Sequence, residues 1–222
     1  HEVRNPLNAI SMTAQRLDRE FSPKENEDKY RELTQMIKSE SIRMNMIIEE
    51  FLKFAKPPKL NRQPTNIEQL LDEVTLLIKS QATYHDIKVD KQYSEIGIWN
   101  LDREQIKQVV LNLLLNGIEA MPDGGTLSVK TWKEGDELSI EVTDTGKGIP
   151  EDVLPRIFDL YFTTKDMGTG LGLSIVQRII AEHGGLIKVN SRSGFGTAFR
   201  IHLPNINTSF SVIGKNGGSN TC

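Results

Sequence analysis

The stretch Asp144-Thr-Gly-Lys-Gly-Ile-Pro150 decides how this chain folds, and it follows directly on a predicted strand. From Leu138 to Asp144 apolar and polar residues alternate, which is the two-residue period of a half-buried strand. Asp144 is therefore expected to point to the same face as the apolar residues before it. An unpaired buried charge costs about several kcal/mol, so this carboxylate needs a strong hydrogen-bond donor, such as the exocyclic amine of adenine. The alternative is that Asp144 caps its own Asp-Thr-Gly turn.

Glycines follow this strand and recur in a second cluster, Gly168-Thr-Gly-Leu-Gly-Leu173, just ahead of a predicted helix. Gly146 and Gly148 are expected to leave room for a flat ring to lie against backbone. The second cluster would present free amides and a helix dipole to phosphate. Neither cluster has the spacing of a dinucleotide fingerprint or of a Walker loop. The pattern predicts a nucleotide site assembled from separated pieces, and in the alternative interpretation the glycines only form loops.

Composition narrows the classes of function. The 222 residues suffice for one or two domains, and the formal net charge of -3 argues against bulk electrostatic binding of nucleic acid or anionic lipid. The single cysteine, Cys222, excludes a disulfide framework and a cysteine-rich metal site. No apolar run approaches the roughly 20 residues of a membrane span. We expect a cytoplasmic protein with no direct membrane contact in this segment, and a chain that starts at His1 is expected to lack an N-terminal region that could tether it to a membrane.

Two amphipathic helices are predicted at the N-terminus, over residues 1–22 and 28–55, with Ser22-Pro-Lys24 between them. In both helices apolar residues recur at intervals of three and four, which is a heptad seam. The seam residues are Val3, Leu7, Ile10, Ala14, Leu17 and Phe21 in the first helix and Leu33, Ile37, Met44, Ile47, Phe51 and Phe54 in the second. A single hairpin supplies only one wall of a core, so these side chains would stay in water. The sequence therefore predicts a homodimer in which two hairpins close a four-helix bundle.

Beyond Lys56-Pro-Pro-Lys59 the pattern changes to alternating helices and strands. Helices are predicted over 66–82, after Asp102 and over 172–183, and strands over 87–93, 97–101, 126–132, 138–143, 186–190 and 197–203. Thr65 and Glu68 form a predicted capping box, and Asp102 caps the helix that follows it. The domains expected are a helical hairpin over 1–56, a linker over 57–64, an α/β domain over 65–204 and a disordered tail over 205–222.

A polar stripe runs along the helix after Asp102. It consists of Gln105, Gln108, Asn112, Asn116 and Glu119. It could be an ordinary solvated face, but two asparagines one turn apart among leucines indicate a polar cleft, because Asn is a poor interior helix former. Asn116 would offer its amide oxygen to Mg²⁺, which keeps several waters and needs few protein ligands. The aromatic-rich loop over 151–167 is expected to act as a lid.

Five segments resemble, in order, the H, N, G1, F and G2 boxes of two-component sensor histidine kinases. They are His1-Glu-Val-Arg-Asn-Pro-Leu7, Asn112-Leu-Leu-Leu-Asn-Gly-Ile-Glu-Ala120, Asp144-Thr-Gly-Lys-Gly148, Phe158 to Phe162 and Gly168-Thr-Gly-Leu-Gly172. The resemblance extends from His1 to about Pro204, and Phe162-Thr-Thr-Lys165 is closest to the nitrogen-regulation branch. It implies an α+β protein in which a dimerising phosphotransfer hairpin precedes a Bergerat-type α/β sandwich that binds ATP.

The resemblance also implies roles for three residues at the N-terminus. His1 would be the phosphoacceptor, its imidazole attacking the γ-phosphate of ATP. Glu2 would accept or orient the ring proton, and Asn5 would position water for removal of phosphate from the partner. That partner would be the receiver domain of a response regulator.

For the nucleotide, the resemblance implies that Asn112 and Asn116 bind phosphates and Mg²⁺, with Asn116 as the metal ligand. Thr197 would help Asp144 to hold adenine through a water. The implied nucleotide contacts are Asn112, Asn116, Asp144, Gly146, Gly148, Lys165, Gly168, Thr169, Gly170, Leu171, Gly172, Leu173 and Thr197. Many relatives carry Lys or Arg where this chain has Glu119, so Lys165 is the substitute candidate for a phosphate contact.

Two other classes use the same features. ATP-driven clamps and hydrolases place a glutamate base four residues before the magnesium-binding Asn, whereas this chain has Asn112 there, and an amide cannot take a proton from water. A dimer module that binds ATP without histidine phosphorylation remains the other alternative.

Overall fold

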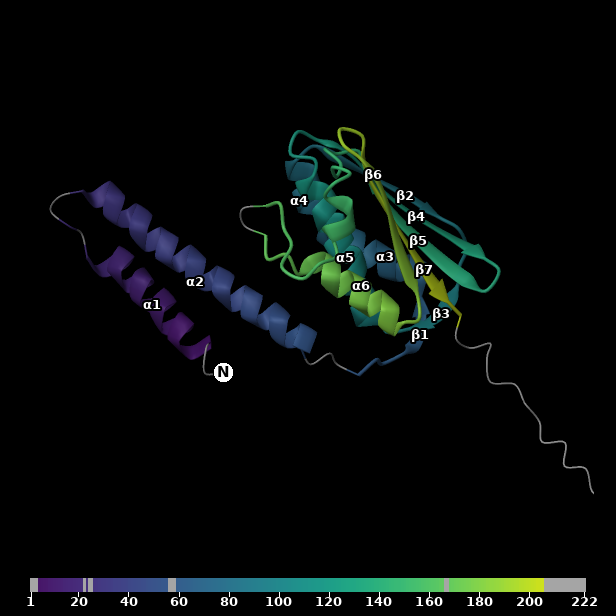
Figure 1. Cartoon of the computed structure of the whole chain (residues 1–222), viewed down its shortest axis with the longest axis horizontal. Helices are drawn as coiled ribbons and strands as arrows, with labels where there is room; N and C mark the ends of the chain where they lie inside the picture. Colours follow the sequence, from purple (N-terminus) through teal and green to yellow (C-terminus); the bar gives the residue numbers. More distant parts are fainter. Residues whose placement is uncertain (1–3, 22, 24–25, 56–58, 166–167, 206–222) are drawn as a thin grey trace, which may run out of the picture. The chain divides into compact units, whose positions relative to one another are not determined.

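The computed structural model describes residues 4–21, 23, 26–55, 59–165 and 168–205. The chain divides into two compact units, one formed by residues 1–59 with 156–175 and the other by residues 60–155 with 176–222. Figure 1 shows a helical hairpin in the first unit and a sheet covered by helices in the second. Among the described helices, none is both long and apolar enough to cross a membrane.

The hairpin consists of α1 (Arg4–Glu20) and α2 (Glu27–Ala55). Its interior contains small and polar side chains as well as leucine, since Leu7, Ala14, Thr34 and Ser41 are all buried. Thr34 and Ser41 satisfy their hydroxyls on backbone carbonyls one turn earlier in α2. Tyr30 ties the helices together by donating its hydroxyl to the Leu17 carbonyl at 2.9 Å. Small residues at this contact let the two helices approach closely.

Large apolar side chains of the hairpin face away from this contact. They are Ile10, Met12, Phe21, Leu33, Met36, Ile37, Ile42 and Met44, with exposed fractions between 38% and 64%. The predicted seam is therefore split, because Leu7 and Ala14 are buried within the hairpin while most of the other described seam residues are exposed. The side chains of Val3, Ile47, Phe51 and Phe54 lie outside those described.

The second unit is built on a mixed five-stranded sheet of order β2-β4-β5-β7-β6. Its strands are β2 (Ile87–Tyr93), β4 (Gly125–Glu134), β5 (Glu137–Asp144), β6 (Leu186–Arg192) and β7 (Gly196–Pro204). Strands β2 and β4 pair in parallel, and the other described pairs of this sheet are antiparallel. A short antiparallel pair, β1 (Gln63–Asn66) with β3 (Ile98–Leu101), stands beside it. The helices are α3 (Ile67–Leu77), α4 (Lys79–Tyr84), α5 (Arg103–Glu119) and α6 (Gly172–Glu182).

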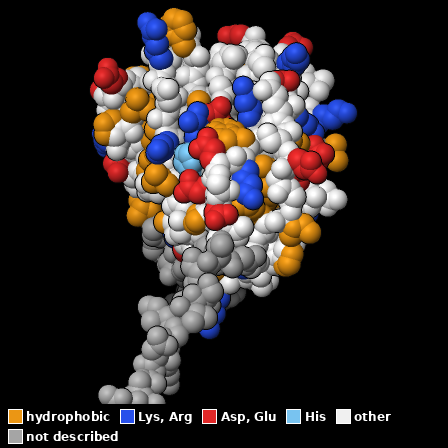
Figure 2. All heavy atoms as spheres, turned by 90° about the vertical axis from the view of Figure 1, so that its right-hand side faces the viewer, with side chains coloured by type: hydrophobic (Ala, Val, Ile, Leu, Met, Phe, Trp, Pro, Cys, Tyr) orange, Lys and Arg blue, Asp and Glu red, His pale blue; other side chains and the backbone are white. Residues whose placement is uncertain are grey.

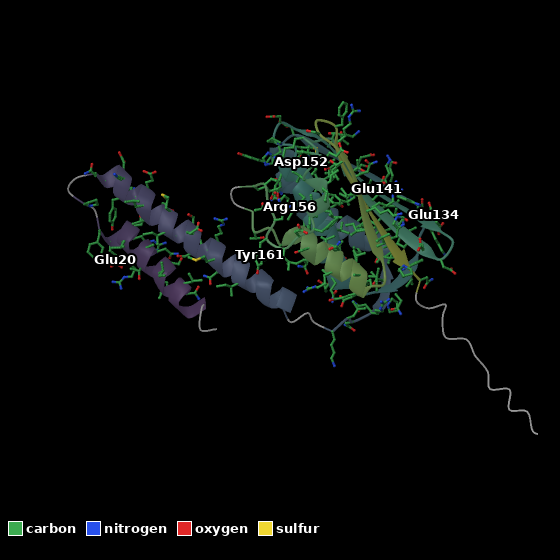
Figure 3. All side chains as sticks on the ribbon, in the orientation of Figure 1. Glu20, Glu134, Glu141, Asp152, Arg156 and Tyr161 are labelled. Atoms are coloured by element: carbon green, nitrogen blue, oxygen red, sulfur yellow. The ribbon has the colours of Figure 1, made fainter. Side chains whose placement is uncertain are left out.

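Helices cover one face of the sheet, and the other face is polar. α3 and α5 lie on the covered face (Figure 1), where Leu113, Ile140 and Val142 are buried. On the opposite face of β5, Glu141 accepts from the Arg200 guanidinium at 2.7 Å, and that guanidinium also lies 5.2 Å from the Trp132 ring centroid. Figure 3 labels Glu141 on its strand, and in the view of Figure 2 acidic and basic side chains are interspersed. The expected strand alternation is confirmed.

The start of α3 differs from the prediction. The predicted capping box of Thr65 and Glu68 is wrong, because Asn66 is the N-cap and accepts from the Gln69 N–H at 2.8 Å. Glu68 instead accepts from the Ile96 N–H at 2.7 Å. The single helix expected over 66–82 is two, α3 and α4, which meet at Ile78. By contrast, the predicted Asp102 cap of α5 is confirmed by the Gln105 N–H bond to Asp102 Oδ1 at 3.1 Å.

Candidate functional site

A row of side chains across four paired strands carries the predicted carboxylate. The strand registers place Leu127 of β4 opposite Asp144 of β5, Asp144 opposite Thr197 of β7, and Thr197 opposite Ser191 of β6. Directly opposed residues of antiparallel strands place their side chains on the same face. That face is the covered one, because Leu127, Asp144 and Thr197 are all buried. The row therefore brings a carboxylate and two hydroxyls together beneath the helices.

Asp144 is 6% exposed, as the strand alternation predicted. Its Oδ1 accepts from the Gly146 N–H at 2.9 Å, so the turn-capping alternative also describes the structure correctly. Burial raises the pKa of Asp144, while the backbone N–H groups of Gly146 and Thr197 pull this pKa down by less. Asp144 lies against Gly117 of α5, where a built Cβ would lie 3.4 Å from the Asp144 Cβ and 4.0 Å from Oδ2. Asp144 is thus a buried acceptor whose ionised form is disfavoured without a further donor.

Glycine is required around Asp144 by the protein's own backbone. A Cβ on Gly117 would lie 2.7 Å from Leu127 Cδ1, so only glycine lets α5 approach the sheet here. A Cβ on Gly146 or Gly148 would collide with the backbone of Ala120 or Arg192 respectively. Protein backbone therefore fills the space that the missing side chains of Gly146 and Gly148 leave, and the expectation that a flat ring lies against these glycines stays a prediction.

The loop after β5 is fastened on two sides. The Lys147 N–H donates to the Ala120 carbonyl at the end of α5, at 3.0 Å, and the Lys147 carbonyl accepts from the Gly194 N–H at 2.7 Å. The Ile149 N–H donates to Ser191 Oγ at 2.8 Å. These bonds hold the loop between α5 and the turn that joins β6 to β7.

The predicted polar helix face is part of this unit. Asn112 and Asn116 lie one turn apart on α5 and are half-buried, and Asn116 precedes the Gly117 that faces Asp144. Among the described residues there is no cluster of three or more His, Cys, Asp or Glu that could hold a metal. The amide oxygen of Asn116 is the type of ligand that Mg²⁺ accepts, since this ion binds through few protein ligands together with phosphate oxygens and waters. Glu119 is exposed at the end of α5.

The second glycine cluster and Lys165, which are also expected to contact phosphate, belong to the other unit. Over 156–175 the Tyr161 N–H donates to the Gly170 carbonyl at 3.0 Å, with both residues in the left-handed region at φ of 65° and 69°. The Arg156 guanidinium lies 4.5 Å from the Phe162 ring centroid, and Figure 3 labels Arg156 and Tyr161 on this segment. Lys165 is exposed, and Gly168 to Gly170, Gly172 and Leu173 are half-buried. The side chain of Leu171 is fully buried.

Some predicted residues lie at the edge of what the structure describes. His1 and Glu2 are outside the described residues, and Asn5 lies in the first turn of α1, where only its backbone is described. The structure brings together Asp144, Thr197 and the Gly146 and Gly148 loop, with Asn112 and Asn116 on the neighbouring helix. It does not relate them to Gly168–Leu173.

Ser191 belongs to the site although sequence reasoning did not single it out. Its Oγ bonds Ile149 N, the Gly196 carbonyl and Thr197 Oγ1 at 2.8, 3.0 and 2.9 Å. The sequence predicted that this strand ends at residue 190, whereas β6 continues to Arg192. Only the register of β6 with β7 shows that the side chains of Ser191 and Thr197 meet.

Comparisons with known proteins agree with this arrangement. Residues 1–59 match the family model of the His Kinase A (phospho-acceptor) domain, and residues 101–207 match that of the histidine kinase-, DNA gyrase B-, and HSP90-like ATPases. The chain is 41% identical over 206 residues to the sensor histidine kinase ZraS of Salmonella typhimurium, covering 92% of the chain and 44% of ZraS. It is 35% identical over 206 residues to sporulation kinase C of Bacillus subtilis, covering 92% of the chain and 47% of that kinase.

Solved structures give the same answer. The catalytic domain of the histidine kinase ThkA matches with a TM-score of 0.61 at 34% identity, over 65% of this chain and 96% of that domain. A complex of ThkA with the response regulator protein TrrA matches with a TM-score of 0.70 at 31% identity, over 92% of this chain and 59% of ThkA. Full-length ShkA in complex with AMPPNP matches with a TM-score of 0.76 at 26% identity, over 92% and 44% of the two chains.

The fold and the site thus define a nucleotide-binding sandwich preceded by a phosphoacceptor hairpin. The chain belongs to the two-component sensor histidine kinases. It spans less than half the length of the curated kinases it matches.

Proposed function

We propose that this chain is the catalytic core of a sensor histidine kinase that binds Mg-ATP and phosphorylates itself on His1. The observation that carries the nucleotide part is the buried pair of acceptors, Asp144 and Thr197, within the residues that match the ATPase family. A buried carboxylate whose ionised form is disfavoured gains most from a ligand that donates to it, and the exocyclic amine of adenine does so. Asn112 and Asn116 then face the phosphates, and bound Mg²⁺ would neutralise phosphate charge with Asn116 as its protein ligand.

The phosphates would be held by the second glycine cluster and the lid. In this proposal Gly168, Thr169, Gly170, Leu171, Gly172 and Leu173 enclose them, and Lys165 supplies the cation that Glu119 cannot. The AMPPNP complex of ShkA supports nucleotide binding by this fold.

In the phosphotransfer step, a ring nitrogen of His1 attacks the γ-phosphorus in line. The new nitrogen–phosphorus bond forms as the bond from phosphorus to the β,γ-bridging oxygen breaks, and ADP leaves. Glu2 accepts or orients the proton on the other ring nitrogen. The phosphoryl group then passes to an aspartate of a response regulator, and Asn5 positions water when the kinase removes phosphate from that partner. The complex of ThkA with TrrA supports a response-regulator partner.

We further propose that the chain is a homodimer through residues 1–56, joined by a linker over 57–64 to a catalytic domain over 65–204. The large apolar side chains exposed on both helices of the hairpin support this, because such side chains gain stability when a partner buries them. The protein is placed in the cytoplasm in this proposal, with any tether to a membrane outside the present segment.

Incubation with γ-labelled ATP and Mg²⁺ tests the kinase assignment. The expected label is stable in base and labile in acid, and His1→Gln abolishes it whereas the control His85→Gln retains it. Label that survives His1→Gln would move the acceptor to another residue. If nucleotide binds but neither the wild-type chain nor His85→Gln becomes labelled, the chain is better described as an ATP-binding scaffold without histidine phosphorylation. Release of inorganic phosphate without a phosphoprotein would favour the hydrolase.

Asn5→Ala separates the two activities of the hairpin. It should leave labelling of His1 unchanged and slow the removal of phosphate from the response regulator, because only the latter needs a positioned water. Asn8→Ala, another asparagine of α1, is the control. Equal loss of both activities in Asn5→Ala would deny Asn5 a separate hydrolytic role.

A further inference from the structure

The Ser191 hydroxyl oxygen lies within hydrogen-bond distance of three polar atoms, but it has one proton and can donate to only one of them. It lies 2.8 Å from the Ile149 nitrogen, 3.0 Å from the Gly196 carbonyl oxygen and 2.9 Å from Thr197 Oγ1. The Ile149 N–H can only donate and the Gly196 carbonyl can only accept. All three bonds are satisfied at once in one arrangement, in which Ser191 gives its proton to the carbonyl and the Thr197 hydroxyl gives its own proton to Ser191.

This arrangement fixes what Thr197 can offer to anything else. Its one proton points along the row toward Ser191, so only lone pairs remain on the other side of its oxygen, where Asp144 lies in the paired strand. An ionised carboxylate also offers only lone pairs. The two side chains nearest the expected base are therefore both acceptors, and the Thr197 hydroxyl cannot turn over to donate without breaking its bond to Ser191.

We propose that Ser191 is a positioning residue that makes this site selective for a purine carrying a 6-amino group over one carrying a 6-oxo group. The inference rests on the proposed binding of ATP at Asp144 and adds the residue that controls the choice of base. An amino group donates to both acceptors, directly or through a water. A 6-oxo group can only accept, and without Ser191 the Thr197 hydroxyl would be released to rotate and donate to it.

The experiment compares the dissociation constants of ATP and inosine triphosphate, whose base has a carbonyl oxygen in place of the amino group and a proton on the neighbouring ring nitrogen. Isothermal titration with Mg²⁺ is carried out on the wild-type chain, Ser191→Ala and the control Ser193→Ala, an exposed serine in the turn that follows β6. We expect Ser191→Ala to lower the preference for ATP over inosine triphosphate by about 2- to 12-fold, the range for one neutral hydrogen bond. Ser193→Ala should keep the wild-type preference.

A merely structural role for Ser191 gives a different result. Loss of the bond to the Ile149 N–H would loosen the loop and weaken both nucleotides by the same factor, leaving the preference unchanged, and that outcome overturns the proposal. Thr197→Val removes the hydroxyl at constant shape and should lower the preference by itself. In that background Ser191→Ala should have no further effect on the preference, and a further decrease would show that Ser191 acts by another route.

The failure of this inference is distinguishable from failure of the proposed function. If the wild-type chain binds ATP and discriminates against inosine triphosphate, the nucleotide site stands, and only the behaviour of the Ser191 and Thr197 variants decides the inference. Should Ser191→Ala not fold, as judged by its circular dichroism, Thr197→Val still decides, because an unchanged preference in this variant would refute any role of the held hydroxyl. A wild-type chain that binds neither nucleotide refutes both proposals.

Discussion

Replacing Asp144 by Asn should have opposite effects on the stability of the unliganded protein and on its affinity for ATP. Asn keeps the shape of the side chain and the oxygen that accepts from the Gly146 N–H at 2.9 Å, and it removes the charge. Burial is the main influence on Asp144, whose side chain is 6% exposed, and it raises the pKa of this carboxyl. The ionised form is therefore less stable in the fold than in the unfolded chain.

The sign of the stability change follows from this raised pKa. The contribution of Asp144 to folding is fully present below the pKa of an unfolded aspartate, about 3.9, and is lost as pH rises through the folded pKa. At pH 7 the wild-type chain carries a cost that Asn lacks. We expect Asp144→Asn to unfold at a higher urea concentration than the wild type at pH 7, and this difference should shrink as pH approaches about 4.

The affinity changes in the other direction. A hydrogen bond to a charged group contributes about 1.5 to 3 kcal/mol, so its loss should weaken ATP binding roughly 10- to 150-fold. At an ATP concentration of about 100 times the wild-type Kd, the ligand stabilises the wild type by about 2.7 kcal/mol. A variant with 100-fold weaker binding gains only about 0.4 kcal/mol at the same concentration.

Calorimetric titration of ATP and urea unfolding at pH 7 and pH 4, with and without Mg-ATP, measure both effects. Asp136→Asn, at an exposed position of the turn between β4 and β5, is the matched control and should change neither quantity. An unchanged Kd in Asp144→Asn would refute the assignment of Asp144 to adenine. A lower urea midpoint at pH 7 would show that burial does not dominate the energetics of this carboxylate.

Three further predictions test other parts of the structure. Ile37→Glu, at a 44% exposed position of α2, should shift the sedimenting mass from dimer toward monomer, whereas Leu77→Glu, 56% exposed on α3, should not. Burial lowers the pKa of His183, which is 2% exposed and accepts the Asp102 N–H, so the free energy of unfolding should fall as pH drops below about 6.5, with a smaller slope in His183→Gln. Gly117→Ala should destabilise the protein by about 1 to 3 kcal/mol in urea unfolding, because its Cβ overpacks against the Leu127 side chain.

Each of these has a clear contrary outcome. If the wild-type chain sediments as a monomer at micromolar concentration, the proposal of a dimeric four-helix bundle is refuted. A pH profile of stability that is identical in His183→Gln would mean that His183 does not titrate differently in the folded and unfolded states. Gly117→Ala with wild-type stability would mean that α5 shifts away from the sheet at little cost.

Local chemistry in the sequence was enough for much of the second unit. The alternation from Leu138 to Asp144 predicted both the strand and the inward carboxylate, and Asp102 was recognised as a cap because its own helix supplies the N–H groups it accepts from. Features decided by distant chain segments could not be predicted in this way. Glu68 does not cap its helix as predicted. It accepts a hydrogen bond from the N–H of Ile96, which is 28 positions further along the chain. The glycines after β5 are explained by Ala120 and Arg192, which only the folded chain brings close.

The same distance dependence explains why Asp144 was found from sequence and Ser191 was not. A carboxylate that ends a strand of alternating apolar and polar residues, on the apolar face, is unusual, and a segment of eight residues is enough to show it. Few physical causes explain such a carboxylate. A serine near the end of a polar strand is unremarkable until the register places it opposite a threonine, which in turn lies opposite that carboxylate. A sequence therefore reveals a site residue such as Asp144 when a charged side chain falls at a position predicted to be buried. A residue such as Ser191, which orients the Thr197 hydroxyl, occupies a position where serine is common. It is recognised only when the hydrogen bonds of the folded chain are assigned to donors and acceptors.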